Sequence, residues 1–251
     1  MHRFYVPAGV PADGPLELPR DVARQISRVL RMRTGEEIGV FDGTGVQWTI
    51  ELDDVSARSA TGHVVDVTRP GTESRVEITL YQSIIDTAAF ELVLQKGAEL
   101  GVTRFVPLLT ERVRGAGSVG ASDSRQRRWA RIVQEASEQS GRVFVPEVTA
   151  PIDLDVAFEE PSDACLIVPW EGELSVSLRD VLSAPVTRAA GAFRVLIGPK
   201  GGLTESEIDL LRGRGAWIVT LGTRILRAET AAIATLSAIL YELDELGTAR
   251  S

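Results

Sequence analysis

One segment, VLIGPKGGLTESE (residues 195–207), gives the clearest indication of how this chain folds. It passes from the apolar run Val195–Ile197 into a glycine-rich loop, and Thr204 and Glu207 then stand at the spacing of a helix-capping box. A strand, a short loop and a helix in this order are typical of an α/β domain. The loop glycines allow a close approach to a ligand, although a tight strand-to-helix turn explains them equally well. The loop lacks the Gly-Lys-Ser/Thr ending of a Walker loop.

Strands and helices alternate on both sides of this segment. Two further apolar runs, Cys165–Val168 and Trp217–Val219, predict central strands that are covered on both faces of a sheet. Other strands are expected at Val76–Tyr81 and Phe105–Leu109, and helices at Phe90–Leu100, Arg127–Ser140 and Glu229–Leu246. This alternation indicates an α/β domain with a mostly parallel sheet.

The first seventy residues have a different pattern. Glu37–Phe41 and Val46–Ile50 flank the turn-rich connection Asp42–Gly45, which is typical of a hairpin. Gly62–Val67 has the β-branched content of a further strand. Several short strands separated by turns favour a small β-barrel, and Arg69–Ser74 is the expected linker to the α/β domain.

A helix is expected from Val22 to Met32 within this first part. Val22, Ile26, Val29 and Leu30 fall on one face, and arginines fall on the opposite face. Residues 20–33 hold five arginines and a single acid. A charged helix face is most often simply solvated, but a one-sided arginine stripe in an acidic protein is also typical of a nucleic-acid contact.

The loop that follows the apolar run 217–219 is also unusual. Its sequence, GTRILRAET (residues 222–230), places Ile225 and Leu226 between two arginines just before a helix. Apolar side chains are costly to leave in water, so we expect these two to wall a pocket or to meet a partner chain.

Composition narrows the classes of function. The 251 residues are 44% hydrophobic and 25% charged, which suits a soluble globular protein of one large or two ordinary domains. The sequence shows neither an apolar stretch long enough to span a membrane nor a secretory signal. We therefore expect a cytoplasmic protein that does not associate with a membrane. The net charge of -8 argues against indiscriminate nucleic-acid coating. The single Cys165 and the histidines His2 and His63 argue against a disulfide, a zinc site and a histidine triad.

Six segments together resemble one known family. They are HRFY (2–5), RVLRM (28–32), QKGAELGV (95–102), EQSGR (138–142), IGPKGG (197–202) and LGTRILRAET (221–230). In this order they look like the successive motifs of the RsmE family of 16S ribosomal RNA uridine-N3 methyltransferases, in the SPOUT superfamily. The resemblance runs from residue 2 to about residue 240. Any one of the motifs is weak evidence, whereas six in register are strong evidence.

This resemblance implies a fold and a cofactor. It implies a PUA-like β-barrel that helps to bind RNA at residues 1–70, followed by a SPOUT α/β domain with a trefoil knot at residues 75–251. It also implies S-adenosylmethionine as methyl donor, no metal, and a homodimer with the last helix near its interface. The residues implied for cofactor binding are Pro169, Ile197, Gly198, Pro199, Gly201, Gly202, Leu221, Gly222, Ile225, Leu226 and Arg227.

The implied substrate is 16S ribosomal RNA or the small ribosomal subunit. Arg227 is our candidate for stabilising the uracil or a nearby phosphate. Glu229 is a weaker candidate for accepting a proton, and a salt bridge at a helix start explains Glu229 at least equally well. The candidates for RNA contact are Arg3, Arg28, Arg31, Lys96, Gln139 and Arg142.

Four residues depart from the family pattern. Lys200 stands where Glu is common, Ala228 where Thr is usual, Gln25 where a His often occurs, and Ala89 where relatives often carry Lys. Three alternative functions therefore stay open. They are a SPOUT methyltransferase of another RNA or base, a non-catalytic RNA-binding factor in ribosome assembly, and a nucleotide-phosphate enzyme that uses the glycine-rich loop.

Overall fold

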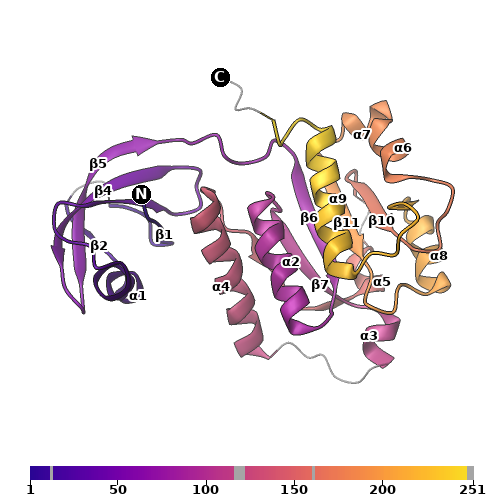
Figure 1. Cartoon of the computed structure of the whole chain (residues 1–251), viewed down its shortest axis with the longest axis horizontal. Coiled ribbons are helices and arrows are strands. Elements are labelled where there is room, and N and C mark those ends of the chain that lie inside the picture. Colours follow the sequence, from indigo (N-terminus) through magenta and orange to yellow (C-terminus); the bar gives the residue numbers. More distant parts are fainter. Residues whose placement is uncertain (12–13, 116–121, 160–161, 248–251) are drawn as a thin grey trace. The chain divides into compact units, whose positions relative to one another are not determined.

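The structure is a computed structural model that describes residues 1–11, 14–115, 122–159 and 162–247 (Figure 1). The chain divides into two compact units. Unit 1 comprises Met1–Glu73 and Ser137–Val145, and unit 2 comprises Ser74–Ala136 and Pro146–Ser251. Among the described residues, no helix is both long enough and apolar enough to cross a membrane.

Unit 1 contains a curled five-stranded mixed sheet (Figure 1). Its strands are β1 (Arg3–Tyr5), β2 (Leu16–Glu17), β3 (Glu37–Phe41), β4 (Gln47–Val55) and β5 (Ala60–Thr68), in the order β1-β3-β4-β5-β2. β3 and β4 pair antiparallel, with Glu37 opposite Glu51 and Phe41 opposite Gln47. The predicted hairpin and the predicted third strand are therefore confirmed. The buried core includes Phe4, Ile38 and Ile50.

The arginine-bearing helix of unit 1 differs from its prediction in one respect. It runs as α1 (Arg20–Arg24) and continues as a π-helical segment, η1 (Gln25–Leu30), which ends at the left-handed Arg31. Val22 and Ile26 are buried as expected, but Val29 is 72% exposed. The expectation for Val29 is wrong because a π-helical turn holds more residues than an α-helical turn, which rotates position 29 off the buried face.

Unit 2 is built on a seven-stranded sheet. Its strands are β6 (Glu77–Ser83), β7 (Arg104–Leu109), β8 (Glu147–Val148), β9 (Ile152–Asp153), β10 (Cys165–Pro169), β11 (Ala192–Ile197) and β12 (Trp217–Val219). The order is β12-β10-β11-β6-β7-β8, with β9 also paired to β7, and each pairing described in the sheet is parallel. This confirms the α/β class with a parallel sheet.

The three apolar runs do not all become central strands. β10 and β11 lie inside the sheet, whereas β12 forms its edge and pairs with β10 alone in this order. Trp217 is 44% exposed. The prediction of a central position is wrong for β12, because a run of three apolar residues is equally compatible with an edge strand that a helix covers on one side.

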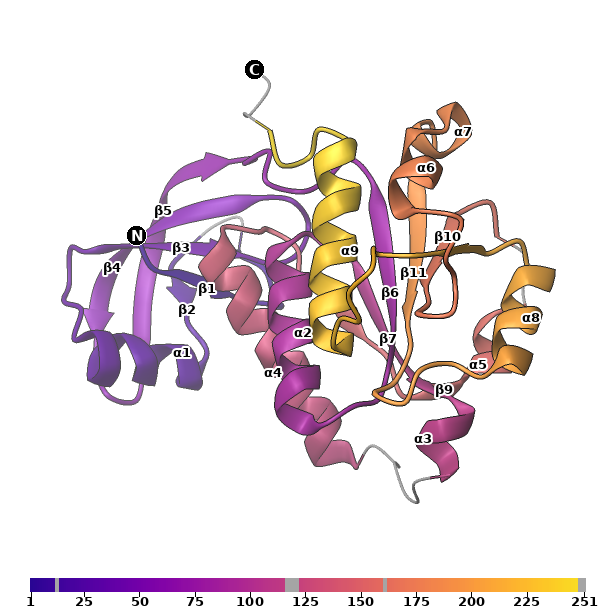
Figure 2. The same cartoon turned by 45° about the vertical axis from the view of Figure 1, so that its right-hand side comes forward.

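Helices follow most of the strands of unit 2. They are α2 (Thr87–Glu99), α3 (Glu111–Gly115), α4 (Asp123–Ser140), α5 (Leu154–Ala157), α6 (Leu178–Ser183), α7 (Pro185–Arg188), α8 (Glu205–Gly213) and α9 (Ala228–Glu242). α9 packs against α2 and β11 (Figures 1 and 2). α6 and α8 pack against β12. α9 ends four residues before the predicted Leu246, where Asp244 takes a positive φ of 64°.

Candidate active site

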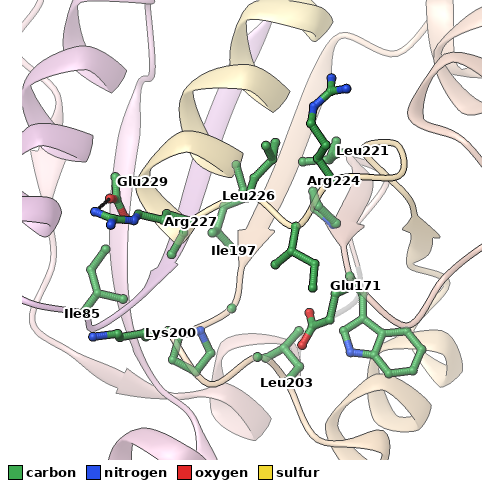
Figure 3. Close-up of a pocket in the computed structure, with 18 of the residues that line it drawn as sticks. Ile85, Glu171, Ile197, Lys200, Leu203, Leu221, Arg224, Leu226, Arg227 and Glu229 are labelled. Atoms are coloured by element: carbon green, nitrogen blue, oxygen red, sulfur yellow. Dashed lines mark ion pairs between the residues drawn. The ribbon is translucent and has the colours of Figure 1, made fainter.

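A pocket of about 790 Å³ opens at the carboxyl ends of four strands of unit 2 (Figure 3). Its walls come from the segments that follow β6, β10, β11 and β12, which are neighbours in the sheet. Because the strands are parallel, segments far apart in the sequence meet at this one edge. This is the edge at which ligands bind in open α/β sheets, and the volume is that of a small-molecule site.

The glycine-rich loop after β11 forms the floor of this pocket. The backbone N–H of Gly202 donates to the carbonyl of Pro199 at 2.9 Å, which closes a tight turn. Gly202 has φ +76°, a left-handed conformation that strains any residue with a Cβ. A Cβ at Gly202 would also collide with Oε1 of Glu171, and one at Gly198 would lie 3.1 Å from Cγ of Leu203. Gly202 is therefore favoured mainly by its backbone conformation, whereas a Cβ at position 198 would require Leu203 to shift slightly.

Two helices hold the glycine-rich loop from behind. The predicted capping box is present, because Thr204 caps the backbone of Glu207 and Glu207 accepts from the backbone of Thr204. The second oxygen of Glu207 accepts from the N–H of Glu111 at 2.8 Å. Arg112, on α3, donates to the carbonyl of Gly201. The capping carboxylate therefore ties α3 and α8 together across the base of the loop.

The apolar loop after β12 lines the opposite part of the pocket. Ile225 is 87% exposed although it is aliphatic, and Leu226 is partly buried. Both residues line the pocket together with Leu221. The expectation that these side chains wall a pocket agrees with their position.

The segment after β10 adds two residues that the motifs did not indicate. Trp170 and Glu171 both line the pocket. The N–H of Trp170 donates to the carbonyl of Val219 at 3.0 Å, so the segment is anchored to the end of β12. Glu173 accepts from the N–H groups of Ser175 and Val176, and these bonds hold the pKa of Glu173 below its ordinary value. The segment after β10 carries no recognisable sequence motif. Only its position directly after an apolar strand could have indicated that it belongs to the site.

Charged side chains of the pocket fall into separate groups. In Figure 3, Arg227, Glu229 and Lys200 lie on one side, and Glu171 and Arg224 lie on the other, with Ile197 and Leu226 between. Nη1 of Arg227 is 4.0 Å from Oε1 of Glu229. Nζ of Lys200 is 4.0 Å from Oδ2 of Asp86, and both of these side chains are more than 80% exposed. Such exposed pairs contribute little to stability.

The pocket gathers nearly all the residues expected to bind the cofactor. Of the eleven, ten line it, and Gly201 instead contributes the carbonyl that Arg112 holds. Lys200, Ala228 and Ala89, which depart from the family pattern, also line this pocket, whereas Gln25 lies in unit 1. Three of the four departures are thus at the site itself. Among the described residues, no cluster of His, Cys, Asp and Glu side chains suits a metal ion.

The residues expected to contact RNA are not all on the surface. Arg28 and Arg31 are exposed, and so is Gln139. Lys96 is partly exposed, and its ammonium donates to Glu99 at 2.8 Å. Arg142 is only 3% exposed, and its Nη2 donates to Glu73 at 2.7 Å.

Arg3 also faces inward. Its Nη2 donates to the carbonyl of Arg142 at 2.8 Å, and its guanidinium lies over the ring of Phe41. Burial lowers the pKa of Arg3, and the nearby Glu73 and Glu138 partly offset this effect. Arg3 and Arg142 are therefore internal contacts of unit 1, so the expectation of RNA contact does not fit their positions. A buried arginine that pairs with an acid looks the same in sequence as one that faces solvent.

Comparison with known proteins agrees with this fold and site. A family model described as an RNA methyltransferase domain matches residues 72–240. The chain belongs to this family. The ribosomal RNA small subunit methyltransferase E of Synechocystis sp. is 33% identical to it, over 86% of this chain and 70% of the relative. The resemblance to the RsmE family is confirmed.

Two solved structures are similar over nearly the whole chain. The first is the ribosomal RNA small subunit methyltransferase E of Neisseria gonorrhoeae bound to S-adenosyl methionine, with a TM-score of 0.87, 34% identity, and coverage of 96% of this chain and 97% of that chain. The second is Lpg2936 of Legionella pneumophila in complex with SAM, with a TM-score of 0.84, 32% identity, and coverage of 95% of this chain and 96% of that chain.

Proposed function

We propose that this protein transfers a methyl group from S-adenosylmethionine to N3 of a uridine in 16S ribosomal RNA. The observation that carries the proposal is the pocket at the carboxyl ends of β6, β10, β11 and β12, which gathers the motif residues of two distant loops. Membership of the RNA methyltransferase family and the named relatives give the reaction and the substrate class. The cytoplasm, where ribosomes assemble, is the expected compartment.

The residues present fit the methyl donor. Ile197, Leu221 and Leu226 offer an apolar wall to a nucleoside, and the glycines at 198 and 202 add no side chains of their own to the floor. The pocket volume of about 790 Å³ suits a ligand of this size. We assign cofactor binding to the ten predicted residues that line the pocket, and the support of their loop to Gly201.

In this mechanism the protein mainly orients the methyl donor and the uracil, and it stabilises the negative charge that develops on the uracil. When bound, S-adenosylmethionine supplies an already activated methyl group. The side chain of Arg227 is 87% exposed, so it is free to meet the uracil and stabilise negative charge as the N3 proton leaves. Glu229 is only 20% exposed and lies near Arg227, where it can hold the departing proton. Close orientation of the reacting groups can lower the activation free energy by about 7–11 kcal/mol.

RNA binding is assigned to the basic helix of unit 1, with Arg28 and Arg31 as phosphate contacts and with Lys96 and Gln139 as further candidates. The five arginines of residues 20–33 are all exposed, and among the described residues none of them forms an ion pair. Phosphate contacts position an RNA without reading its sequence. We assign residues 1–70 to a PUA-like RNA-binding domain and residues 75–251 to a knotted SPOUT domain, from which Ser137–Val145 depart by clustering with unit 1.

A homodimer is also proposed, with α9 near its interface. Tyr241 is 76% exposed on this helix, and Ala234 is exposed, while Ala232 is buried. Light scattering of the purified protein measures the mass directly: twice the chain mass supports the dimer, and a single chain mass rejects it.

The function is tested by incubating the purified protein with labelled S-adenosylmethionine and small ribosomal subunits from a strain that lacks this protein. Nucleoside analysis should yield labelled 3-methyluridine. Label in another nucleoside would identify a methyltransferase of different specificity. Binding of subunits without binding of the methyl donor in calorimetry would favour the non-catalytic assembly factor.

A further inference from the structure

The carboxylates that line the pocket differ in their partners. Asp86 faces Lys200, and Glu229 faces Arg227, each with its closest nitrogen and oxygen 4.0 Å apart. Among the described residues, Glu171 has no ion pair and accepts no hydrogen bond. In Figure 3 its carboxylate points into the pocket, on the side away from Lys200 and Arg227. The pocket therefore offers one carboxylate that has no ion pair among the described residues. Arg112, which is outside the pocket lining, lies near it, because Nη1 of Arg112 is 3.2 Å from the Cβ position of Gly202 that Oε1 of Glu171 also approaches.

The backbone on either side of Glu171 is fixed. The N–H of Trp170 donates to the carbonyl of Val219 at 3.0 Å, and the N–H of Glu173 donates to the carbonyl of Trp170 at 3.2 Å. The ring of Trp170 lies so close to Gly172 that a Cβ there would collide with it. The carboxylate of Glu171 in turn occupies the space that a Cβ of Gly202 would need. The anchored backbone therefore fixes where the Glu171 side chain begins, while the side chain itself is exposed to the pocket.

The net charge of the methyl donor is opposite in sign to that of the Glu171 carboxylate. S-adenosylmethionine carries a sulfonium and an ammonium against one carboxylate, so its net charge is positive. The pocket also contains Lys200, Arg224 and Arg227, which repel a cation. An opposite charge within about 4–6 Å favours a charged group in a protein site. A cationic ligand therefore gains most beside the Glu171 carboxylate, which lies away from Lys200 and Arg227 (Figure 3).

We propose that Glu171 is the counter-charge for the positive charge of the methyl donor, and so helps to set the affinity of this site for a cationic nucleoside. The inference rests on the proposed function. It adds a specificity residue that stands outside the glycine-rich and apolar loops. It also divides the pocket by charge, with the donor's cation near Glu171 and the uracil near Arg227.

The test is calorimetric binding to the full-length protein and to two variants. Glu171→Gln removes the charge but keeps a side chain of the same size with an acceptor oxygen. Glu205→Gln is the matched control, because Glu205 is an exposed residue of α8 outside the pocket and its replacement changes the net charge equally. The ligands are S-adenosylmethionine, S-adenosylhomocysteine, which lacks the sulfonium charge, and methylthioadenosine, which lacks both positive charges.

We expect Glu171→Gln to weaken S-adenosylmethionine binding about tenfold, which corresponds to about 1.4 kcal/mol. The affinity for methylthioadenosine should stay unchanged. Glu205→Gln should bind every ligand as the wild type does. A loss for S-adenosylmethionine alone places the sulfonium at Glu171, and an equal loss for S-adenosylhomocysteine places the ammonium there. Wild-type affinity of Glu171→Gln for S-adenosylmethionine overturns the inference, as does an equal loss for methylthioadenosine. A wild-type protein that binds none of the three ligands overturns the proposed function as well.

Discussion

Replacing Gly202 by alanine tests whether the glycine-rich loop is built for the ligand. The new methyl group would sit on a residue with φ +76° and would meet the carboxylate of Glu171. The loop cannot simply move back, because Arg112 holds the carbonyl of Gly201 and Glu207 caps the following helix. The strain therefore falls on the floor of the pocket.

The magnitude follows from the backbone and the collision. A left-handed conformation costs about 1–2 kcal/mol for a residue with a Cβ. If the loop of the free variant relaxes to an unstrained conformation, ligand binding must bring back the strained left-handed conformation. The Kd for S-adenosylmethionine should then rise about 5- to 30-fold. If the loop does not relax, the same 1–2 kcal/mol lowers the Tm by about 2–8 °C. Displacement of Glu171 adds to the loss of affinity in either case.

Calorimetry and thermal unfolding of the same sample separate the two outcomes. Gly191→Ala is the matched control, since Gly191 precedes the same strand, has no positive φ and has open space around its Cβ position. A double variant, Gly202→Ala with Glu171→Ala, removes the collision and leaves only the backbone strain. The reasoning is refuted if Gly202→Ala keeps both the affinity and the Tm of the wild type.

Three further predictions concern other parts of the chain. Arg28→Glu with Arg31→Glu should weaken RNA binding and reduce its salt dependence, with donor affinity unchanged; equal loss of both affinities would count against an RNA-contacting helix. Arg142→Ala should lower the free energy of unfolding in urea by roughly 3 kcal/mol, because it leaves the partly buried Glu73 without its ion-pair partner, whereas the exposed Gln139→Ala should change it by less than about 0.5 kcal/mol. Burial raises the pKa of the Cys165 thiol, so alkylation at pH 7.5 should be slower in the folded protein than in urea, and equal rates would contradict this.

The sequence predicts those parts of the fold that local patterns determine. The hairpin of β3 and β4 has a turn between two β-branched runs, and the capping box at Thr204 has its spacing and both of its hydrogen bonds. The order of the strands is not local. Nothing in the runs at residues 165–168 and 217–219 distinguishes the interior β10 from the edge strand β12, because that depends on which strands come to lie beside each.

The same distinction explains the site. Its two loops were predicted because their glycines and exposed apolar residues are unusual within a few positions of sequence, whereas Glu171 was missed because an isolated carboxylate is ordinary. Its chemistry arises only when β10 is placed between β11 and β12, which brings Glu171 against Gly202, thirty-one residues further along the chain. Arg142 is the converse case, since it matches a motif but is enclosed with Glu73. Whether a charged residue has a functional role depends on the residues that the fold places beside it. The test of this site must therefore compare Glu171 with an equally charged residue outside the pocket.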